Sequence, residues 1–398
     1  MDGPPTTQYE LNPRWCLAHD TIDRQDFERL IQWLRTYPHL TKGTVTRDFE
    51  SRWSSWLGRS HSVFCNSGSS ANLLMYYTLL ASARLQNKKV IVPSVGWVTS
   101  IAPAIQFGFE PIMCEADPET FGLDLDHLET LLKRHQARTV MLVQVLGVPH
   151  KMRELMALKA RYEFVLLEDA CAAIGAIYEG RRVGSFGDMS SFSFYFGHQM
   201  STIEGGMVST NDKELNDLLL MLRSHGWSKD LDGTAHHALV TQYGIDDFHS
   251  PFVFYEPGFN LRSTDLNAFI GIGQLEKLDW MTAQRRQNHA HYLARLSGSF
   301  YVQRPPSGSD VASISVGLLA DSRHQRQRIV QALSQHGVET RIFSAGNLGL
   351  HPFWINRYGA ASFPVADRIH HCGFFLPNHA GLTEEDIATI STIVLEAA

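Results

Sequence analysis

Apolar residues near the start of the chain recur at the spacing of one face of a helix. In the segment DRQDFERLIQWLRT they fall at positions i, i+3, i+4 and i+7, which are Phe27, Leu30, Ile31 and Leu34. This periodicity predicts an amphipathic helix that carries the four side chains on one face.

Further along, short apolar runs alternate with helical patterns. The runs SVFC, KVIVP, TVMLVQV and FVLLED have the length of strands, and patterns such as SANLLMYYTLLASARL and LDHLETLLKRH lie between them. Such alternation indicates parallel β-α-β units with helices on the faces of the sheet. The expected fold class is therefore α/β, with a mostly parallel central sheet.

The pattern changes near residue 280. A long helical stretch, GIGQLEKLDWMTAQRRQNHAHYLARL, leads to the apolar run VASISVGLLA and to two more helical patterns, DSRHQRQRIVQALSQHG and TEEDIATISTIVLEA. We therefore expect a large domain over residues 1–279, which includes the N-terminal helix, and a smaller α+β domain over residues 280–398.

Composition narrows the class of protein. The chain has 398 residues, of which 44% are hydrophobic and 19% charged, and its formal net charge is −6 without any basic block, so nucleic acid is not an expected partner. The start, MDGPPTTQYELNP, lacks the basic and apolar regions of a signal peptide, and no run approaches the roughly 18 apolar residues that span a bilayer. We expect a cytoplasmic protein that does not associate with membranes.

The cysteine pattern bears on metal and redox chemistry. The five cysteines are Cys16, Cys65, Cys114, Cys171 and Cys372, and no two of them form a C-x-x-C pair. Such scattered cysteines disfavour a zinc site, a disulfide framework and a closely spaced cluster motif. We expect small buried side chains here and no metal site.

Polar residues that end apolar runs are the first candidates for chemistry, because ligands of open parallel sheets collect at the carboxyl ends of the strands. CNSGSSAN, residues 65–72, follows the run SVFC and opens a helical pattern. Its small residues, Gly68 and Ser69 among them, would let backbone N–H groups and hydroxyls meet a phosphate at the positive end of the helix. A Gly-Ser turn that only caps a helix is the alternative.

Two later positions carry comparable signals. Asp169 ends the run FVLLED, and a carboxylate there would suit the pyridinium nitrogen of pyridoxal phosphate (PLP); a helix cap or a loop charge is the alternative. Ser193 stands five residues before His198, on the same loop as the pair Gly205-Gly206.

Taken in order, the Gly-Ser turn, Trp97, Asp169 and Ser193 resemble the fold type I PLP enzymes, and more narrowly the DegT/DnrJ/EryC1/StrS sugar aminotransferase family. The resemblance covers nearly the whole chain. It is carried by the segments LTKGTVTRDFESRW, CNSGSSANLL, VPSVGWVTSIAPAIQFGFEPIMCEAD, LLEDACAAIGA, GSFGDMSSFSFYFGH, EGGMVSTND, FNLRSTDLNAFIGIGQLEKLD and GFFLPNH.

The resemblance implies a role for each of these residues. Trp97 would stack on the pyridine ring and Asp169 would pair with its nitrogen. Ser69 and Ser193 would bind the phosphate together with the backbone of Gly68. For Trp97, packing in the core is the alternative.

Three residues nearer the C-terminus are also implied. Asn260, in GFNLRSTD, matches a position that reaches the phosphate of the neighbouring subunit in the family, which implies a homodimer with composite active sites. His225, in LRSHGW, and Arg262 are candidates for contacts to glutamate or to a sugar. A helix-end or salt-bridge role is the alternative for both.

By this resemblance, His198 stands where aminotransferases of the family carry the lysine that binds PLP covalently; a histidine that is only hydrogen-bonded within the loop is the alternative. The lysines nearest in sequence are Lys159 and Lys213, and neither is at the motif position. An imidazole nitrogen cannot form the stable imine that a primary amine forms with an aldehyde, so the cofactor must be held non-covalently. A histidine can still move protons near neutral pH, because its ordinary pKa is roughly 6.5.

A lysine-to-histidine change is typical of the 3-dehydratase branch of this family. The segment VETRIFSAGNLGLHPFW also resembles this branch, which often carries T-R-x-x-x-x-G-N. The resemblance implies removal of the C3 hydroxyl from a nucleotide-linked 4-keto-6-deoxyhexose, with GDP as the expected nucleotide. L-glutamate would convert PLP to pyridoxamine phosphate (PMP), giving 2-oxoglutarate, and His198 would act as acid and base before ammonia is released.

Some dehydratases of the branch use an iron–sulfur cluster and a reductase, but this chain lacks the cysteine group that holds such a cluster, so we expect neither. Two alternatives to the dehydratase remain: an aminotransferase that works without an anchoring lysine, and a PLP-fold protein without turnover that binds or regulates.

The chain departs from the family pattern at three positions. Gln199 replaces a second histidine that dehydratases tend to have after the first. Ile203 stands where the family commonly has glycine, and Ala172 stands where it is often polar. These departures bear on which sugar is used and on the outcome of the reaction.

Overall fold

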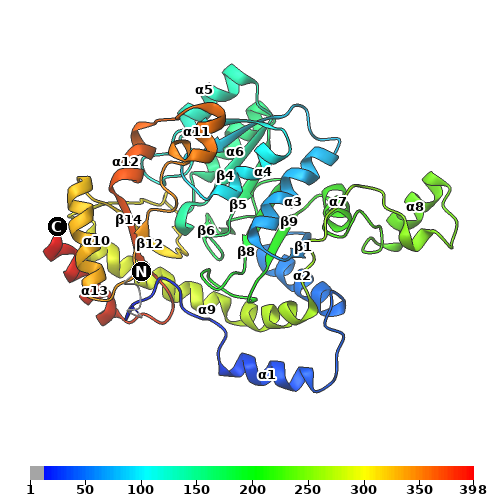
Figure 1. Ribbon diagram of the computed structural model, residues 1–398, viewed down its shortest axis with the longest axis horizontal. Helices are drawn as coiled ribbons and strands as arrows, with labels where there is room; N and C mark the ends of the chain where they lie inside the picture. The colour runs from blue at the N-terminus through cyan, green and yellow to red at the C-terminus, as the bar shows by residue number, and fades with distance from the viewer. Residues whose placement is uncertain (1–12) are drawn as a thin grey trace, which may run out of the picture.

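A seven-stranded sheet forms the centre of the larger part of the molecule in the computed structural model, which describes residues 13–398 (Figure 1). In spatial order its strands are β1 (His61–Cys65), β9 (Gly206–Thr210), β8 (Met189–Ser193), β5 (Val165–Asp169), β4 (Thr139–Val143), β2 (Lys89–Pro93) and β3 (Glu110–Cys114). All neighbouring pairs are parallel except the two that involve β9. The predicted α/β class and mostly parallel sheet are confirmed.

Helices cover both faces of this sheet because successive side chains of each strand point to opposite faces. Val63 packs toward α3 and α7, for example, whereas Phe64 packs toward α2 and α9. The first face is covered by α3 (Gly68–Ala81), α4 (Ala102–Gln106) and α7 (Lys213–Arg223). The second face is covered by α2 (Thr44–Leu57), α5 (Leu125–His135), α6 (Met152–Tyr162) and α9 (Asp265–Leu296).

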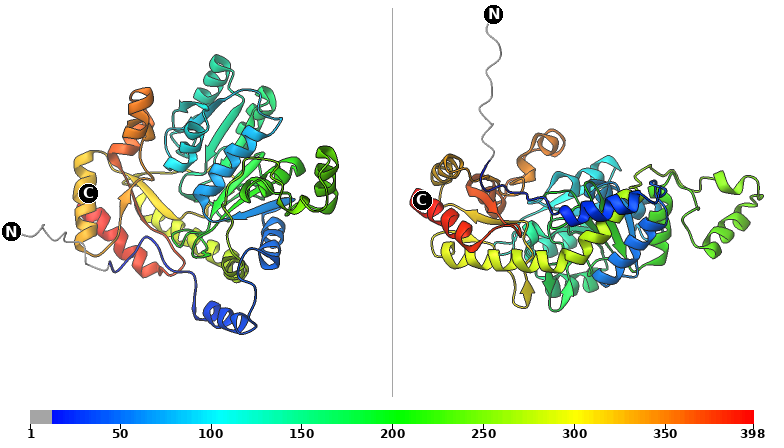
Figure 2. Two further views of the ribbon diagram at one scale, coloured as in Figure 1. Left: turned by 45° about the vertical axis from the view of Figure 1, so that its right-hand side comes forward. Right: turned by 90° about the horizontal axis from the view of Figure 1, so that it is seen from below.

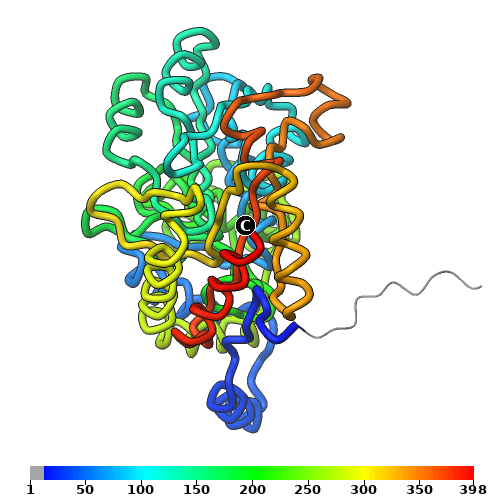
Figure 3. Tube along the Cα trace, turned by 90° about the vertical axis from the view of Figure 1, so that its left-hand side faces the viewer, coloured from blue at the N-terminus to red at the C-terminus, as the bar shows by residue number. Residues whose placement is uncertain are grey.

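A second, antiparallel sheet lies in the C-terminal part. In spatial order its strands are β10 (Tyr301–Val302), β12 (Ser315–Leu319), β14 (Gly373–Pro377) and β13 (Arg341–Ile342). The helices of this part are α10 (Arg323–Gln335), α11 (Pro352–Tyr358), α12 (Pro364–Cys372) and α13 (Glu384–Ala397). Figure 3 views the molecule from this end, where α10 and α13 pack together.

The two parts share elements. Helix α9 is 32 residues long and runs through the expected boundary after residue 279, so the division into two domains at that point stays a prediction. A small sheet also joins β11 (Ser309–Asp310) of the C-terminal part to β6 (Ile177–Tyr178) and β7 (Arg181–Arg182) of the larger part.

Two helices stand away from the body: α1 (Arg24–Leu34) and α8 (Gly233–Tyr243) (Figures 1 and 2). The predicted N-terminal helix is therefore present, but Phe27 and Ile31 on its apolar face are 55% and 50% exposed. Its main aromatic contact is Trp33, which stacks on Phe269 of α9 with ring centroids 4.6 Å apart. Within residues 13–398, Leu30 and Leu34 of the predicted apolar face are partly covered, whereas Phe27 and Ile31 are left exposed.

The first twelve residues, which carry most of the segment from which we predicted the absence of a signal peptide, lie outside the described residues. Over residues 13–398, no helix has both the length and the apolar character that crossing a bilayer requires.

Candidate active site

The predicted site residues of the central strands meet at one edge of the sheet. Asp169 and Ser193 are the last residues of β5 and β8, and Gly68 follows the end of β1. Because β9 runs opposite to its neighbours, its first residue, Gly206, lies at the same edge, where it is the register partner of both Cys65 and Ser193. The strand order thus assembles a ligand-binding edge from segments far apart in sequence.

The Gly-Ser turn forms a tight cradle at the start of α3. Ser67 caps the helix, since the Ser70 N–H donates to Ser67 Oγ at 3.0 Å. A Cβ atom on Gly68 would collide with Ser193, 2.9 Å from its Oγ, and one on Gly206 would lie 2.7 Å from the Gly68 nitrogen. Only glycine allows these segments to approach so closely, which places the start of α3 at the edge of the sheet, where the N–H groups of a first helical turn can bind an anion.

Two buried polar side chains hold the Asp169 carboxylate. Asn72 Nδ2 donates to Asp169 Oδ2 at 2.8 Å, and Ser100 Oγ donates to the same oxygen at 2.6 Å. Asn72 is itself fixed by Ser191, whose Oγ donates to Asn72 Oδ1 at 2.6 Å. The network sets the direction of the carboxylate and leaves an acceptor for a cationic nitrogen.

Trp97 lies at the same edge, after the end of β2, and is 54% exposed, so it does not pack in the core. The segment is tied to the site because the Ser100 N–H donates to the Trp97 carbonyl at 3.1 Å. From the C-terminal part, Asn347 forms a β-bridge with Val95, and Ser344 Oγ donates to the Gly96 carbonyl at 2.9 Å. The segment that resembled T-R-x-x-x-x-G-N is therefore a neighbour of Trp97.

His198 lies half-buried on the loop between β8 and β9. Its backbone is held, since its N–H donates to the Tyr195 carbonyl at 2.9 Å, but its Nδ1 is buried and has no hydrogen-bond partner within residues 13–398. Burial lowers the pKa of His198 to about 4; the Asp169 carboxylate opposes this shift and the Arg285 guanidinium adds to it. The imidazole is therefore neutral near pH 7, a form that accepts a proton.

The lysines nearest to His198 in sequence lie at the opposite edge of the sheet. Lys159 contacts Asp188, which precedes the first residue of β8, at 3.1 Å. Lys213 follows the carboxyl end of β9 and contacts Asp217 at 2.6 Å. Neither lysine replaces the missing one.

The three departures from the family pattern have structural counterparts. Gln199 Nε2 donates to the carbonyls of Ala172 and Ala312, both at 2.7 Å, so it links the loop to two backbone segments. Ala172 thus contributes its carbonyl to this link. Ile203 has a φ of 69°, in the left-handed region that a β-branched side chain rarely adopts, which explains why glycine suits this position.

The remaining predicted residues form a second cluster, beside β1. Arg262 Nε donates to Asn260 Oδ1 at 3.0 Å, and Arg262 Nη2 lies 3.3 Å from His225 Nε2. This segment adjoins the phosphate cradle through the backbone, since the Asn66 N–H donates to the Leu261 carbonyl at 2.9 Å. His225 follows the end of α7, so the helix-end description also fits it.

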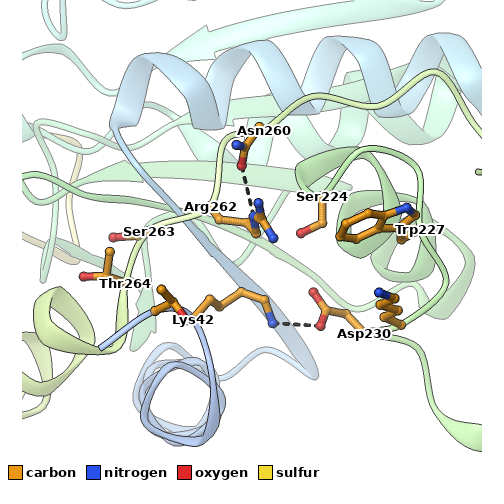
Figure 4. Close-up of a pocket in the computed structure, with 10 residues that line it drawn as sticks. Lys42, Ser224, Trp227, Asp230, Asn260, Arg262, Ser263 and Thr264 are labelled. Carbon is orange, nitrogen blue, oxygen red and sulfur yellow. Dashed lines mark hydrogen bonds and ion pairs between the residues drawn. The ribbon is translucent and has the colours of Figure 1, made fainter. Parts of the chain in front are cut away.

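A pocket of about 410 Å³ opens on this cluster (Figure 4). Its lining residues are Thr41, Lys42, Ser224, Trp227, Lys229, Asp230, Asn260, Arg262, Ser263 and Thr264. Lys229 Nζ lies 4.2 Å from the Trp227 ring centroid, and Lys42 Nζ lies 2.7 Å from Asp230. Cations beside an aromatic face suit an anionic ligand that also carries a ring.

A series of ion pairs, most of them buried, lies next to this pocket. Arg223, which is fully buried, contacts Glu50 Oε1 at 2.5 Å and Asp230 Oδ2 at 3.1 Å. Asp230 therefore joins Arg223 to Lys42 and fixes the lysine at the pocket. Its two cationic partners hold the pKa of Asp230 below its usual value despite burial.

The sequence did not point to several of these residues. Asn72 and Arg285 are polar side chains inside helices, and Lys42 and Lys229 are isolated lysines in segments without periodicity. For Asn72 the sequence contains a weak signal, because a side-chain amide that is buried near the start of a helix needs hydrogen-bond partners.

The chain is similar in sequence to a known protein family and to individual proteins. The model of a family described as the DegT/DnrJ/EryC1/StrS aminotransferase family matches residues 20–395. A GDP-4-keto-6-deoxy-D-mannose 3-dehydratase of Yersinia pseudotuberculosis is 30% identical over 386 residues, which cover 95% of this chain and 97% of that protein. A GDP-perosamine synthase of Caulobacter vibrioides is 29% identical over 387 residues, which cover 94% of this chain and 96% of that protein.

Solved structures show the same likeness. A crystal structure of GDP-4-keto-6-deoxymannose-3-dehydratase with a trapped PLP-glutamate geminal diamine superposes with a TM-score of 0.86 at 26% identity. The match covers 96% of this chain and 100% of that chain. The likeness therefore includes both the larger and the C-terminal part.

Proposed function

The chain belongs to the DegT/DnrJ/EryC1/StrS aminotransferase family, and we propose that within it the chain is a nucleotide-sugar 3-dehydratase that works with PLP and L-glutamate. The observation that carries this proposal is His198 on the loop after β8, whose buried Nδ1 has no hydrogen-bond partner within residues 13–398; by the family resemblance this residue would stand in the place of the cofactor-binding lysine. The similar 3-dehydratase structure, with its PLP-glutamate species, supports the choice of cofactor and amino donor.

The residues present fit PLP. The cradle that only glycine permits at Gly68 and Gly206 would hold the phosphate, with Ser69 and Ser193 beside it. The fixed carboxylate of Asp169 would pair with the ring nitrogen, and Trp97 offers an exposed indole face for stacking. When bound, the aminated cofactor supplies a primary amine and an electron-accepting ring.

The chain's own part in the reaction centres on proton transfer. The imidazole of His198 is neutral near pH 7 and would accept a proton at Nδ1, the atom that has no hydrogen-bond partner in the described part of the chain. Because a histidine at this position forms no covalent bond to the cofactor, the cofactor amine stays available to a keto sugar. Loss of the C3 hydroxyl and release of ammonia would follow.

The nucleotide-sugar would use the pocket around Trp227. Lys42, Lys229 and Arg262 would supply positive charge for a diphosphate. The similar proteins act on GDP-linked sugars, which makes a GDP-linked 4-keto-6-deoxyhexose the first substrate to test.

The assembly we propose is a homodimer with composite sites. The uncovered apolar face of α1 and the projecting α8, whose residues are all at least partly exposed, suit contacts with a second copy. In such a dimer Asn260 would reach the phosphate bound by its partner.

An aminotransferase is the second candidate, because a GDP-perosamine synthase is almost as similar as the dehydratase. An amino sugar would then be the product, although neither Lys159 nor Lys213 lies at the edge of the sheet that carries His198. A protein without turnover would form neither product.

The test is incubation of the protein with PLP, L-glutamate and GDP-4-keto-6-deoxymannose, followed by measurement of 2-oxoglutarate, ammonia and the mass of the sugar. Ammonia together with a sugar that has lost one oxygen supports the dehydratase. An amino sugar without ammonia contradicts it. His198→Asn, which keeps a polar side chain but cannot act as a base, should abolish ammonia release.

A further inference from the structure

Arg285 of α9 is a buried cation that has no counter-ion within residues 13–398. Arg285 is 3% exposed, and within residues 13–398 no carboxylate lies within salt-bridge distance of its guanidinium. Burial alone lowers the pKa of Arg285, to about 10. The Arg285 guanidinium therefore still carries its charge near neutral pH while it is buried. Its desolvation costs free energy, which other interactions of the guanidinium must offset.

The guanidinium binds three backbone carbonyls from three segments. Nη2 donates to the carbonyl of His198 at 3.1 Å, and Nη1 donates to that of Ile314 at 3.3 Å and to that of Asn378. The contact with Asn378 is reciprocal, because Asn378 Nδ2 donates to the Arg285 carbonyl at 3.1 Å. Ile314 precedes β12 and Asn378 follows β14, so Arg285 ties the loop of His198 to the C-terminal sheet.

The charge of Arg285 also reaches the imidazole. The charged groups that act on His198 are Asp169, from β5, which favours protonation, and Arg285, from α9, which opposes it. The adjacent Arg286 pairs instead with Asp310 at 3.5 Å. Asn72 and Ser100 are neutral donors, so Asp169 keeps its negative charge, and the imidazole lies in the field of Asp169 and Arg285 together.

We propose that Arg285 is a positioning residue for His198: its guanidinium fixes the backbone carbonyl of the residue whose imidazole transfers protons, and it places a positive charge beside that imidazole. The inference rests on the proposed function for its meaning in turnover. The effect on the imidazole itself does not depend on any reaction.

The test compares Arg285→Met, which removes the charge and the donors, with Arg285→Lys, which keeps the charge. The NMR titration of His198 is followed in the full-length protein with ¹³C-labelled histidine, and its signal is identified by its loss in His198→Asn. Arg285→Met should raise the pKa of His198 by about one unit, the usual size of the effect of one nearby charge. Arg285→Lys should leave the pKa close to the native value.

Arg286→Met is the matched control, because it removes a neighbouring guanidinium that does not contact the loop; it should leave the titration of His198 unchanged. If Arg285→Met does not fold, Arg285→Gln replaces it. A variant that melts at a lower temperature but titrates at the native pKa would overturn the proposal and reduce Arg285 to a structural cross-link.

Kinetics provide the second readout. As the pH is lowered, the rate of 2-oxoglutarate formation from L-glutamate should begin to fall at a higher pH in Arg285→Met than in the native protein. When Arg285→Met is added to His198→Asn, the rate should fall by less than about twofold further, because the effects of residues that act through one another are not additive. A titration shift without any L-glutamate reaction would leave the inference about Arg285 standing and would count against the proposed function alone.

Discussion

Gly68 and Ser193 approach each other so closely that the first can carry no side chain: a Cβ atom on Gly68 would lie 2.9 Å from Ser193 Oγ. This contact joins the start of α3 to the end of β8, at the edge of the sheet where we propose that the phosphate binds. Four predictions follow from this and related features of the site, the buried histidines and the loop.

Gly68→Ala should force the turn away from Ser193. Overpacking at such a contact destabilises proteins by about 1–3 kcal/mol, and a displaced turn should weaken PLP binding by about tenfold or more. Urea unfolding and an absorbance titration with PLP measure the two effects. Gly298→Ala is the control, because a Cβ atom there would meet open space. Native PLP affinity in Gly68→Ala would contradict the assignment of the cradle.

Asp169→Asn removes the charge that the network of Asn72 and Ser100 holds in place. A hydrogen bond to a charged group contributes about 1.5–3 kcal/mol, so the rate of 2-oxoglutarate formation should fall about 10- to 100-fold. Asp188→Asn, at the opposite edge of the sheet, is the matched control and should keep the native rate per folded molecule. An unchanged rate in Asp169→Asn would exclude a role for its charge.

Acid should destabilise the protein between about pH 6.5 and pH 4. Burial lowers the pKa of His289 to about 4, and that of His150 and His379 likewise. In this pH range the histidines of the unfolded chain bind protons, whereas the buried histidines of the folded chain do not. The free energy of unfolding therefore falls as the pH drops through this window.

His289→Gln should reduce the slope of that free energy against pH by up to about 1.4 kcal/mol per pH unit near pH 5, as expected for one proton. Urea unfolding at a series of pH values measures the slope. The native slope in His289→Gln would show that this imidazole is already protonated in the folded state.

Ile203→Asn should stabilise the protein by about 0.5–1 kcal/mol. Ile203 has a φ of 69°, which strains a β-branched residue but suits asparagine, and its side chain is 50% exposed, so little buried surface is lost. Thermal or urea unfolding checks the change. Ile203→Val keeps the branch and should bring no gain, so equal stabilisation by both variants would rule out relief of strain as the cause.

The sequence predicted the parts of this structure that depend on local pattern. The apolar run FVLLED became β5, which places Asp169 at its carboxyl end, and the alternation of runs and helical patterns gave the parallel sheet. The family resemblance then led to the loop that carries His198. These signals lie in contiguous residues, where periodicity and turn chemistry decide the conformation.

Features that depend on tertiary partners could not be predicted in this way. The spacing of Phe27 and Ile31 shows that they share a face of α1, but nothing in the spacing says whether that face is covered. Asn72 and Arg285 gain their roles from residues nearly a hundred positions away, Asp169 and His198. Only the folded chain brings such pairs together.

The antiparallel strand β9 has a consequence for how the loop of His198 can vary. Because Ser193 and Gly206 are direct partners across two hydrogen-bonded strands, both ends of the loop are fixed side by side, as in a hairpin. Closing a loop between fixed ends becomes harder only slowly as the loop lengthens. Extra residues at the exposed positions Ile203 and Glu204 can therefore be accepted without a shift in strand register, whereas the buried Phe194 and the contacts of His198 and Gln199 keep the rest of the loop in place.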